Sequence, residues 1–453
     1  MKALNGFGLA FLLATIVLIL SLPRRWAALA LLLGTFSMTL TQGLQIGPFN
    51  FFAIRLLLLA GIVRVVLRRE RIAGDLNGLD KLMIAFAVWA TLVSLLRDDP
   101  LTAFKANLGI VFNTCGSYFL LRVFCTSIED SLRLCAMTVL LLAPLAVEMF
   151  SEHITLRNAF AVLGGAPEWP QIREGHVRAQ GPFGHPILAG TVGAVCLPLA
   201  IALWKSRRAV ALAGVLACVA MILGSASSGP VMSGMFGLVA LLMWPLRDRM
   251  RHVRRLSLLG LLALSLVMKA PPYYLIARID IAGGSTGWYR ARLIESSLQH
   301  IDEWWLAGTD RTGHWMATGL DADHADITNH YIFMGVTGGI VLLVLFVFTL
   351  AAAFRYVGAA ATMAPSPGEP DRRFFVWSLG AALFAHAATF ISVSYFDQSF
   401  VSLYLTLAAI AAVGIRETAT KPNTAWPARP VRPWLVDSIH SAPRPAQRTW
   451  HVR

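Results

Sequence analysis

Charged residues are scarce in this sequence of 453 residues: Asp, Glu, Lys and Arg make up 14% of it, whereas apolar types make up 56%. Soluble globular domains carry about 25% charged residues, so the composition excludes an ordinary soluble chain. The apolar residues lie in runs of about 20, the length of helix that crosses a hydrocarbon core about 30 Å thick. We therefore expect an all-α polytopic membrane protein.

Paired cysteines, internal repeats and a cleavable signal peptide are also lacking. The first apolar run leads into Pro23-Arg24-Arg25 without a small-residue cleavage site, so no cleavable signal is expected. The absence of a visible repeat disfavours many transporter classes. The cysteines have no paired spacing, which indicates small core residues and neither a disulfide framework nor a metal site. They are Cys115, Cys125, Cys135, Cys196 and Cys218.

The net charge of +14 is carried by short basic breaks between the apolar runs. Cytoplasmic loops of membrane proteins retain Lys and Arg in this way. Membrane spans separate the basic segments, so they cannot form one nucleic-acid-binding surface, and no nucleic-acid partner is expected. The breaks are Arg24-Arg25, Arg68 to Arg71, Lys205 to Arg208, Arg247 to Arg255 and Asp371 to Arg373.

Hydropathy predicts about 12–13 transmembrane helices within residues 1–415. Placing the basic breaks inside puts the N-terminus outside, although twelve spans with both ends inside also fit. Residues 416–453 form a Pro-rich basic tail, expected to be disordered and cytoplasmic. The expected spans are 6–22, 26–42, 50–67, 81–97, 104–124, 131–150, 187–204, 209–224, 229–246, 255–270, 330–354, 374–392 and 398–415.

The two longest polar breaks, 151–186 and 271–329, fall on the outer side in this arrangement. Long polar loops in compact proteins are usually functional. In the second loop, apolar residues recur at helical spacing from Tyr289 to Trp305, which predicts an amphipathic helix on the outer face. This loop also holds eight acidic residues: Asp280, Glu295, Asp302, Glu303, Asp310, Asp321, Asp323 and Asp326.

The first outer cluster of interest runs from Arg173 to Pro186. Arg173 and Arg178 are planar donors that can bind phosphate bidentately. Gly181-Pro182 and Gly184 indicate turns that bring the backbone close to a ligand. A plain turn with solvated arginines is the alternative.

A second cluster, Gly287 to Leu293, opens the predicted amphipathic helix. Arg290 and Arg292 are two positions apart, so only one of them can face a given side of a helix. We expect one to face the site and the other to face water or lipid headgroups, unless both only snorkel to the interface.

The third cluster, Asp321 to Tyr331, enters a long predicted span. His330 suits proton transfer because an unperturbed histidine titrates near neutral pH. Asp326 precedes it by four residues, so the two could pair if the helix begins that early. Two other interpretations stay open: His330 as a polar helix cap, or a divalent-metal site formed by Asp321, Asp323, His324 and Asp326.

Together the three clusters place arginines and a histidine in one outer compartment beside membrane spans. A ligand that fits is a lipid-linked diphosphate, with the arginines on the diphosphate and the spans on the lipid tail. His330 would then activate an incoming hydroxyl.

These residues resemble the O-antigen ligase and polymerase superfamily of bacterial inner-membrane glycosyltransferases over about residues 50 to 415. The resemblance rests on Arg178 to Pro186 before a span, and on Arg290 leading Leu293 in the large loop. It also rests on Trp305-Leu306-Ala307-Gly308 and on Asn329-His330-Tyr331 with Gly338-Gly339.

The resemblance implies a metal-independent, inverting transfer of glycan from undecaprenyl diphosphate to a sugar hydroxyl on the periplasmic side, without a cofactor. It implies that Arg178 and Arg290 bind diphosphate and that His330 assists the acceptor. Asp326, Asn329 and His185 are expected to support these groups. Many relatives carry His-Asn where this chain has Asn329-His330, and the turn Ser225 to Gly229 lacks an arginine often found near there. The acceptor, a lipid A core or another lipid-linked glycan, is not decided.

Two other functional classes remain open. A transporter or flippase for lipid-linked glycan predicts ionisable groups deep within spans, and Arg55, Lys105 and His386 are few and scattered. A non-enzymatic scaffold would account for the tail but not for outward arginines beside a histidine.

Overall fold

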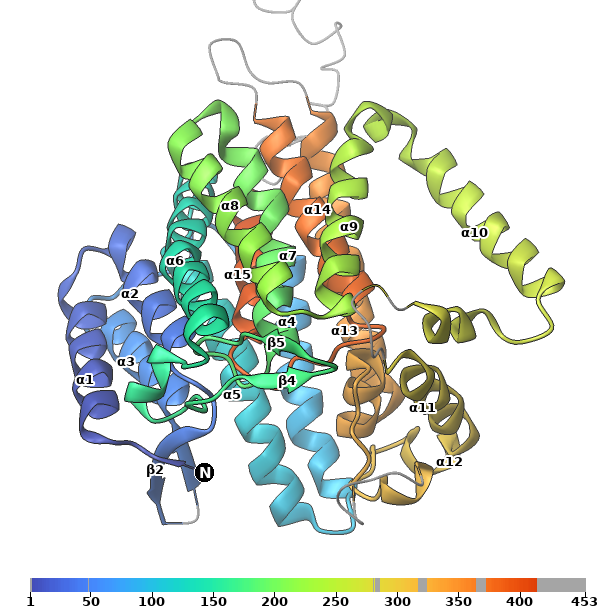
Figure 1. Ribbon diagram of the computed structural model, residues 1–453, viewed down its shortest axis with the longest axis horizontal. Helices are drawn as coiled ribbons and strands as arrows, with labels where there is room; N and C mark the ends of the chain where they lie inside the picture. The colour runs from blue at the N-terminus through green and yellow to red at the C-terminus, as the bar shows by residue number, and fades with distance from the viewer. Residues whose placement is uncertain are drawn as a thin grey trace, which may run out of the picture. The chain divides into compact units, whose positions relative to one another are not determined.

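The computed structural model describes residues 2–47, 49–279, 281, 286–316, 324–363 and 372–413. The predicted tail, 416–453, and the residues Asp280, Asp321 and Asp323 lie outside these ranges. The described segments belong to one compact unit (Figure 1).

Most of the described chain is α-helical. The helices are α1 (Gly6–Ser21), α2 (Arg24–Ser37), α3 (Ala53–Leu67), α4 (Gly78–Leu92), α5 (Pro100–Phe124), α6 (Ile128–Thr155), α7 (Pro186–Ala202), α8 (Arg208–Gly224), α9 (Ser228–Leu242), α10 (Met250–Val267), α11 (Gly287–Gln299), α12 (Ile301–Trp304), α13 (His330–Thr362), α14 (Arg373–Thr389) and α15 (Phe400–Val413). Short 3-10 helices are η1 (Val93–Leu96), η2 (Ala159–Leu163), η3 (Leu203–Lys205), η4 (Trp244–Arg249), η5 (Pro272–Arg278) and η6 (Gly313–Trp315). The strands are β1 (Lys2–Ala3), β2 (Gln42–Ile46), β3 (Phe49–Phe52), β4 (Gln171–Arg173) and β5 (His176–Arg178).

Several of these helices suit a membrane. Among the described residues, four are long and apolar enough to cross one: Gly78–Leu96, Ile128–Thr155, Pro186–Lys205 and His330–Thr362. A fifth span results if the bent pair Ser228–Leu242 and Trp244–Val267, with an angle of 71° between them, is counted as one. The helical class is thus confirmed. Every expected span overlaps a helix, but the number of 12–13 spans stays a prediction.

One boundary between expected spans was wrong. The expected spans 26–42 and 50–67 extend too far toward each other, because residues 42–46 and 49–52 form an antiparallel hairpin in which Gly43 is opposite Phe52. Gly47 turns the chain with a φ of +59°, a conformation that favours glycine. Polar side chains at Gln42 and Gln45 also favour this extended segment over a lipid-facing helix. Helices α2 and α3 are accordingly shorter than expected.

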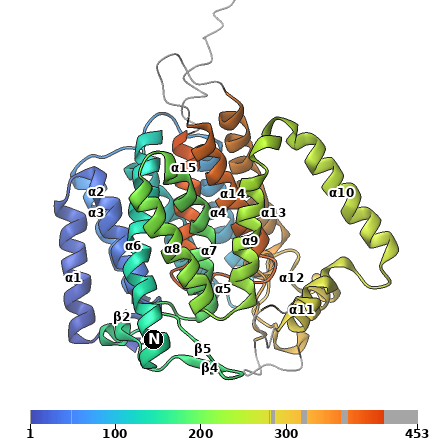
Figure 2. The same cartoon turned by 45° about the horizontal axis from the view of Figure 1, so that its top comes forward.

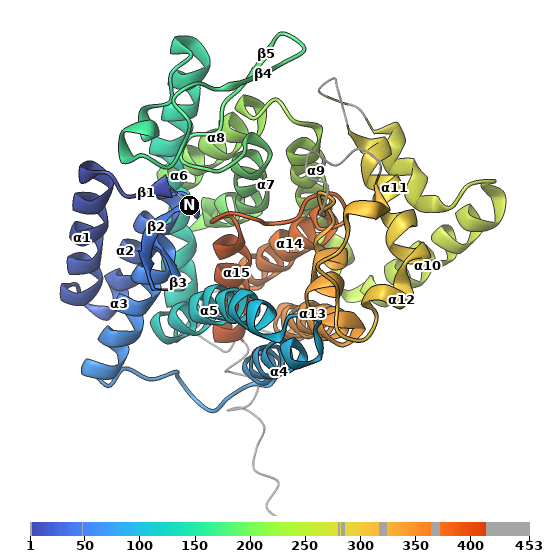
Figure 3. The same ribbon diagram turned by 90° about the horizontal axis from the view of Figure 1, so that it is seen from below.

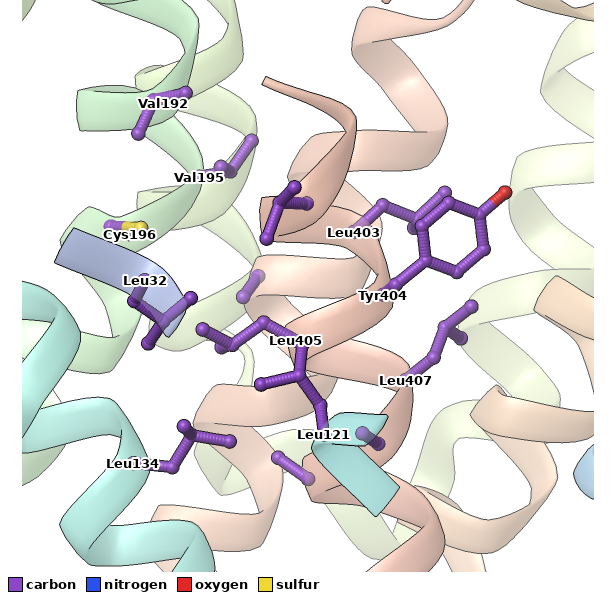
Figure 4. Packing of buried hydrophobic residues seen from close by; sticks show 14 of the residues in the cluster. Leu32, Leu121, Leu134, Val192, Val195, Cys196, Leu403, Tyr404, Leu405 and Leu407 are labelled. Carbon is purple, nitrogen blue, oxygen red and sulfur yellow. The ribbon is translucent and has the colours of Figure 1, made fainter. Parts of the chain in front are cut away.

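Helix α15 is the centre of the bundle, and each of its residues from Phe400 to Val413 is buried. A helix that is apolar on all sides is stable only when other elements surround it. Figure 4 shows Leu403, Tyr404, Leu405 and Leu407 among side chains of α2, α5, α6 and α7. Seen from below, α15 lies between α5, α14 and α7 (Figure 3).

The connections between helices gather at two opposite ends of the bundle. At one end, two of the basic breaks meet: Arg24 Nη2 donates to the carbonyl of Arg71 (3.1 Å), and Arg68 Nη2 donates to that of Leu20 (2.6 Å). At the other end lie the two long polar loops, which contain the hairpin β4–β5 and helices α11 and α12 (Figure 1). The basic breaks and the polar loops therefore lie at different ends.

Helix α10 differs from the other long helices because none of its residues is buried. Figures 1 and 2 show it standing apart from the bundle. Its exposed leucines, from Leu256 to Leu266, present an apolar surface that suits a lipid environment.

A buried ion pair joins α4 to α5. Asp80 and Arg122 are both inaccessible to solvent, and Arg122 Nε lies 3.5 Å from Asp80 Oδ1. The Tyr118 hydroxyl donates to the same oxygen at 2.7 Å, and Asp80 Oδ2 accepts the backbone N–H of Asn77 at the start of α4. Removal of one buried partner leaves the other charge uncompensated.

We therefore expect Arg122→Met to lower the free energy of unfolding by about 3–5 kcal/mol, measured by thermal unfolding in detergent. Arg157→Met is the control, because Arg157 and its partner Glu168 are more than half exposed. Arg157→Met should lower the free energy of unfolding by less than about 1 kcal/mol. Equal losses in the two variants would contradict the assignment.

Candidate functional site

The turn that joins β5 to α7 is fixed on one side by helix α6. Glu152 Oε2 accepts the backbone N–H groups of Gln180 (3.0 Å) and Gly181 (2.8 Å). The Asn158 side chain donates to the carbonyl of Gly181 at 2.7 Å. Gly181 has a φ of +55°, so glycine suits this position better than other residues.

On the other side, the connection between α14 and α15 holds the same turn. Asp397 Oδ2 accepts the N–H of Gly184 at 2.9 Å, and Gln398 Nε2 donates to the carbonyl of Pro182 at 2.7 Å. Both Asp397 and Gln398 are buried. Two segments far apart in the sequence therefore fix the backbone just after Arg178.

Arg178 itself is buried, with 7% of its surface exposed. Its Nη2 donates to the hydroxyl of Ser227 at 2.6 Å, and Ser227 donates to the carbonyl of Ser225 at 2.8 Å. Its Nε is buried without a hydrogen-bond partner, and no carboxylate of the described residues lies within 4 Å of the guanidinium. A buried charge without a counterion is costly, so this group is suited to bind an anion.

Arg173 and Arg290 complete a cluster around Arg178. Burial lowers the pKa of Arg178, and the positive charges of Arg173 and Arg290 lower it further. Burial and then Arg173 also lower the pKa of Arg290, whereas Asp326 raises it. The Nε of Arg290 is buried without a partner among the described residues. The hairpin β4–β5 and helix α11 thus bring three guanidinium groups close enough to repel one another.

Arg292 is placed differently from Arg290, as expected for two helical positions that differ by two. Its Nη1 donates to Glu295 Oε2 at 2.7 Å, and the Tyr274 hydroxyl donates to the same oxygen at 2.7 Å. The Arg292 side chain is more than half exposed. Arg290 therefore belongs to the arginine cluster, and we leave Arg292 out of it.

His185 lies at the start of α7, beside the arginine cluster. Its Nδ1 accepts the backbone N–H of Ile187 at 3.1 Å, so the hydrogen of the neutral ring is on Nε2. Burial lowers its pKa to about 4, and the charges of Arg178, Arg290 and Arg173 act in the same direction. His185 is thus neutral at pH 7 and can donate a hydrogen bond from Nε2.

His330 is the first residue of α13 and is 4% exposed. Its Nδ1 lies 3.2 Å from the Ser394 hydroxyl and 3.4 Å from the backbone N of Tyr395. Four aromatic rings surround it: those of Phe333, Phe346, Phe390 and Tyr395. The alternative of a capping histidine is not needed here, because Asn329 caps the helix by accepting the N–H groups of Tyr331 and Ile332.

Asp326 and His330 do not share a helix face, so the condition for their pairing is not met. That pairing required both residues on one helix, but α13 begins at His330 and Asn329 has extended backbone angles. Asp326 is exposed, and its carboxylate interacts electrostatically with Arg290. The alternative metal site is only partly described, because Asp321 and Asp323 lie outside the described residues.

The connection between α14 and α15 lies against both parts of the site. Tyr395 packs on His330 with ring centroids 5.7 Å apart, and the next residue, Phe396, packs on His185 at 6.2 Å. Asp397 then holds Gly184. The histidine and the arginine-bearing turn are therefore linked through three consecutive residues.

Sequence reasoning missed the residues that hold Arg178 in place: Ser227, Glu152, Asp397 and Gln398. A signal existed for Glu152, because an acidic residue near an apolar run is costly unless it is paired. Ser227 gave no signal, since serine in a turn is common.

Compared with known proteins, the chain matches no protein-family model and no curated protein sequence. The resemblance to the O-antigen ligase and polymerase superfamily therefore stays a prediction from the residues.

His185 predicts a dependence of stability on pH. Its folded pKa of about 4 lies below the value of 6.5 for an unperturbed histidine, so the unfolded chain binds more protons between these values. Stability from this group is therefore complete above pH 6.5 and is lost as the pH falls towards 4, by at most about 3 kcal/mol.

We expect His185→Asn, which keeps a helix-capping side chain, to have a melting temperature less sensitive to acid between pH 6.5 and 4. The exposed His176 of the hairpin β4–β5 provides the control His176→Asn. If the two variants follow the same pH curve, the lowered pKa of His185 is refuted.

Proposed function

We propose that this protein is a bacterial inner-membrane glycosyltransferase of the O-antigen ligase and polymerase type. It transfers glycan from undecaprenyl diphosphate to a sugar hydroxyl on the periplasmic face, by an inverting reaction without a metal ion. The observation that carries the proposal is the convergence of Arg173, Arg178 and Arg290, with Arg178 buried and without a carboxylate partner among the described residues.

A diphosphate fits this cluster better than a single carboxylate does. Guanidinium groups bind phosphate oxygens bidentately, and three of them from two different loops can spread over two phosphates. Their mutual repulsion, which lowers the pKa of Arg178 and Arg290, is relieved by a ligand with several negative charges. Neutral His185 adds a donor without adding charge.

A lipid-linked substrate suits the position of the cluster. The turn that follows Arg178 leads into α7, which is one of the helices that are apolar and long enough to cross a membrane. The phosphates can therefore bind at the end of the bundle while the prenyl chain stays among apolar helices. We propose that this end of the bundle faces the periplasm. The basic breaks lie at the opposite end, and basic loops are retained on the cytoplasmic side of the membrane.

In the proposed reaction the acceptor hydroxyl oxygen forms a bond to the anomeric carbon of the donor sugar. The bond from that carbon to the diphosphate oxygen breaks, and undecaprenyl diphosphate leaves with one more negative charge. The arginines stabilise this growing charge, and the hydroxyl proton passes to His330.

His330 needs a tautomer change for this role. The backbone N–H of Tyr395 can only donate, so Nδ1 accepts in the resting state and Nε2 carries the hydrogen. Transfer of a proton to Nε2 requires the ring hydrogen to lie on Nδ1, where the Ser394 hydroxyl can accept it. Ser394 is therefore part of the proposal.

The first test uses purified protein in nanodiscs with the undecaprenyl-diphosphate glycan of its own host, with and without lipid A core. We expect Arg178→Lys to lower the release of undecaprenyl diphosphate about 100-fold, because lysine keeps the charge but loses the planar donor pair. Arg292→Lys, on the same helix as Arg290 but exposed, should stay near wild type.

The products of this reaction distinguish a polymerase from a ligase. Longer lipid-linked glycans indicate a polymerase, and glycan on the lipid A core indicates a ligase. Folded wild-type protein that releases no undecaprenyl diphosphate under either condition contradicts a transferase and favours a transporter, flippase or scaffold.

His330 gives a separate prediction. We expect His330→Ala to abolish transfer, while binding of the lipid-linked donor, measured by its protection against thermal unfolding, is retained because the arginines are intact. Ser394→Ala should lower turnover without abolishing it. An active His330→Ala variant removes this residue from the mechanism but leaves the arginine cluster in place.

A further inference from the structure

A second group of ligand-type side chains lies in the large polar loop, beyond the end of α11. His300, Glu303 and His314 each offer one ligand atom, and the three atoms lie within 4.8 Å of one another. The His314 Nε2 atom is 2.8 Å from Glu303 Oε1. About ten residues of helix separate Arg290 from His300, or about 15 Å, so this group is distinct from the arginine cluster.

The hydrogen bonds around these side chains decide which ring nitrogen of His300 is free to bind a metal. His300 Nδ1 lies 2.9 Å from the carbonyl of Ser296. A carbonyl can only accept, so Nδ1 carries the hydrogen and Nε2 of the neutral ring keeps a free lone pair. Metal-binding histidines are typically fixed in this way by a bond from their other nitrogen.

Trp315 orients the remaining part of the group. Its Nε1 donates to Glu303 Oε2 at 2.9 Å, which leaves Oε1 toward His314. Its ring stacks on His300 with centroids 5.8 Å apart and an interplanar angle of 17°. Its carbonyl accepts the Ser296 hydroxyl at 3.0 Å. Each ligand residue is therefore held by a neighbour before a metal binds.

We propose that His300, Glu303 and His314 form a binding site for Zn²⁺. Two imidazole nitrogens and one carboxylate oxygen are a donor set that zinc accepts, whereas Mg²⁺ and Ca²⁺ prefer oxygen ligands alone. When the metal binds, the His314 hydrogen that faces Glu303 moves to the other ring nitrogen. Because His314 and Glu303 are partly exposed, water can complete the coordination.

The site has a structural consequence for the loop. It joins the end of α11, helix α12 and the turn η6, which also share a small core of Leu293, Trp304 and Trp315. Bound zinc stabilises the helix that carries Arg290. This inference does not rest on the proposed function, since none of the three ligands belongs to the arginine cluster.

The test measures zinc on the full chain in nanodiscs, after removal of any affinity tag and treatment with a chelator. Protein is incubated with ZnCl₂, passed through gel filtration into metal-free buffer and analysed by mass spectrometry of the metal. We expect about one zinc per chain for wild type. His300→Ala and His314→Ala should bind zinc at least tenfold more weakly, and Glu303→Gln, which keeps the shape of the side chain, should also weaken it.

His153→Ala is the matched control, because His153 is an exposed histidine on α6, outside the cluster. Circular dichroism and the gel-filtration profile show whether each variant is folded, and Glu303→Gln gives the answer if the alanine variants are not. Wild type without zinc overturns the proposal. So does zinc binding that survives His300→Ala but is lost in His324→Ala, which places the metal in the segment 321–326. Neither result depends on glycan transfer.

Discussion

The buried positive charge of Arg178 is the constraint on which the rest of this structure depends. Burial of a guanidinium costs free energy unless an anion or a set of acceptors compensates it. Here Ser227 accepts one hydrogen bond, while Arg173 and Arg290 add like charges instead of opposite ones. The fold holds this arrangement in place, and the site therefore favours a polyanionic ligand. We interpret the site as preorganised for diphosphate, because its donors do not have to be assembled when the ligand arrives.

The helical bundle supplies the rigidity that this arrangement needs. Helix α15 is buried throughout, and the connection that leads into it carries Asp397 and Gln398, which hold the turn after Arg178. Glu152 on α6 holds the same turn from the other side. Carboxylates that bind backbone N–H groups fix the loop without neutralising the arginines. Glu152 and Asp397 therefore position the backbone, and Arg178 keeps its charge for a ligand.

The large polar loop contributes the third arginine through a small tryptophan-rich core of its own. Trp304 donates to the carbonyl of Ser297, and Trp315 links Ser296, Glu303 and His300. These contacts fix the direction of α11, so that Arg290 faces the cluster while Arg292 pairs with Glu295. A metal ion at His300, Glu303 and His314 would strengthen the same core. The small core of the large polar loop is thus connected to the arginine cluster through helix α11.

The sequence by itself determined the helical, apolar character of the chain and the segments that carry the arginines, because hydropathy and spacing are local properties. It also indicated that Arg290 and Arg292 face different ways, which follows from helix geometry alone. Only the tertiary structure decided which of the two joins Arg173 and Arg178, and that Glu152, Ser227 and Asp397 hold the turn. It also separated Asp326 from His330, since α13 begins one residue after its Asn329 cap. These contacts join residues up to about 200 positions apart in the sequence. They depend on the packing of distant helices, which no local sequence pattern shows.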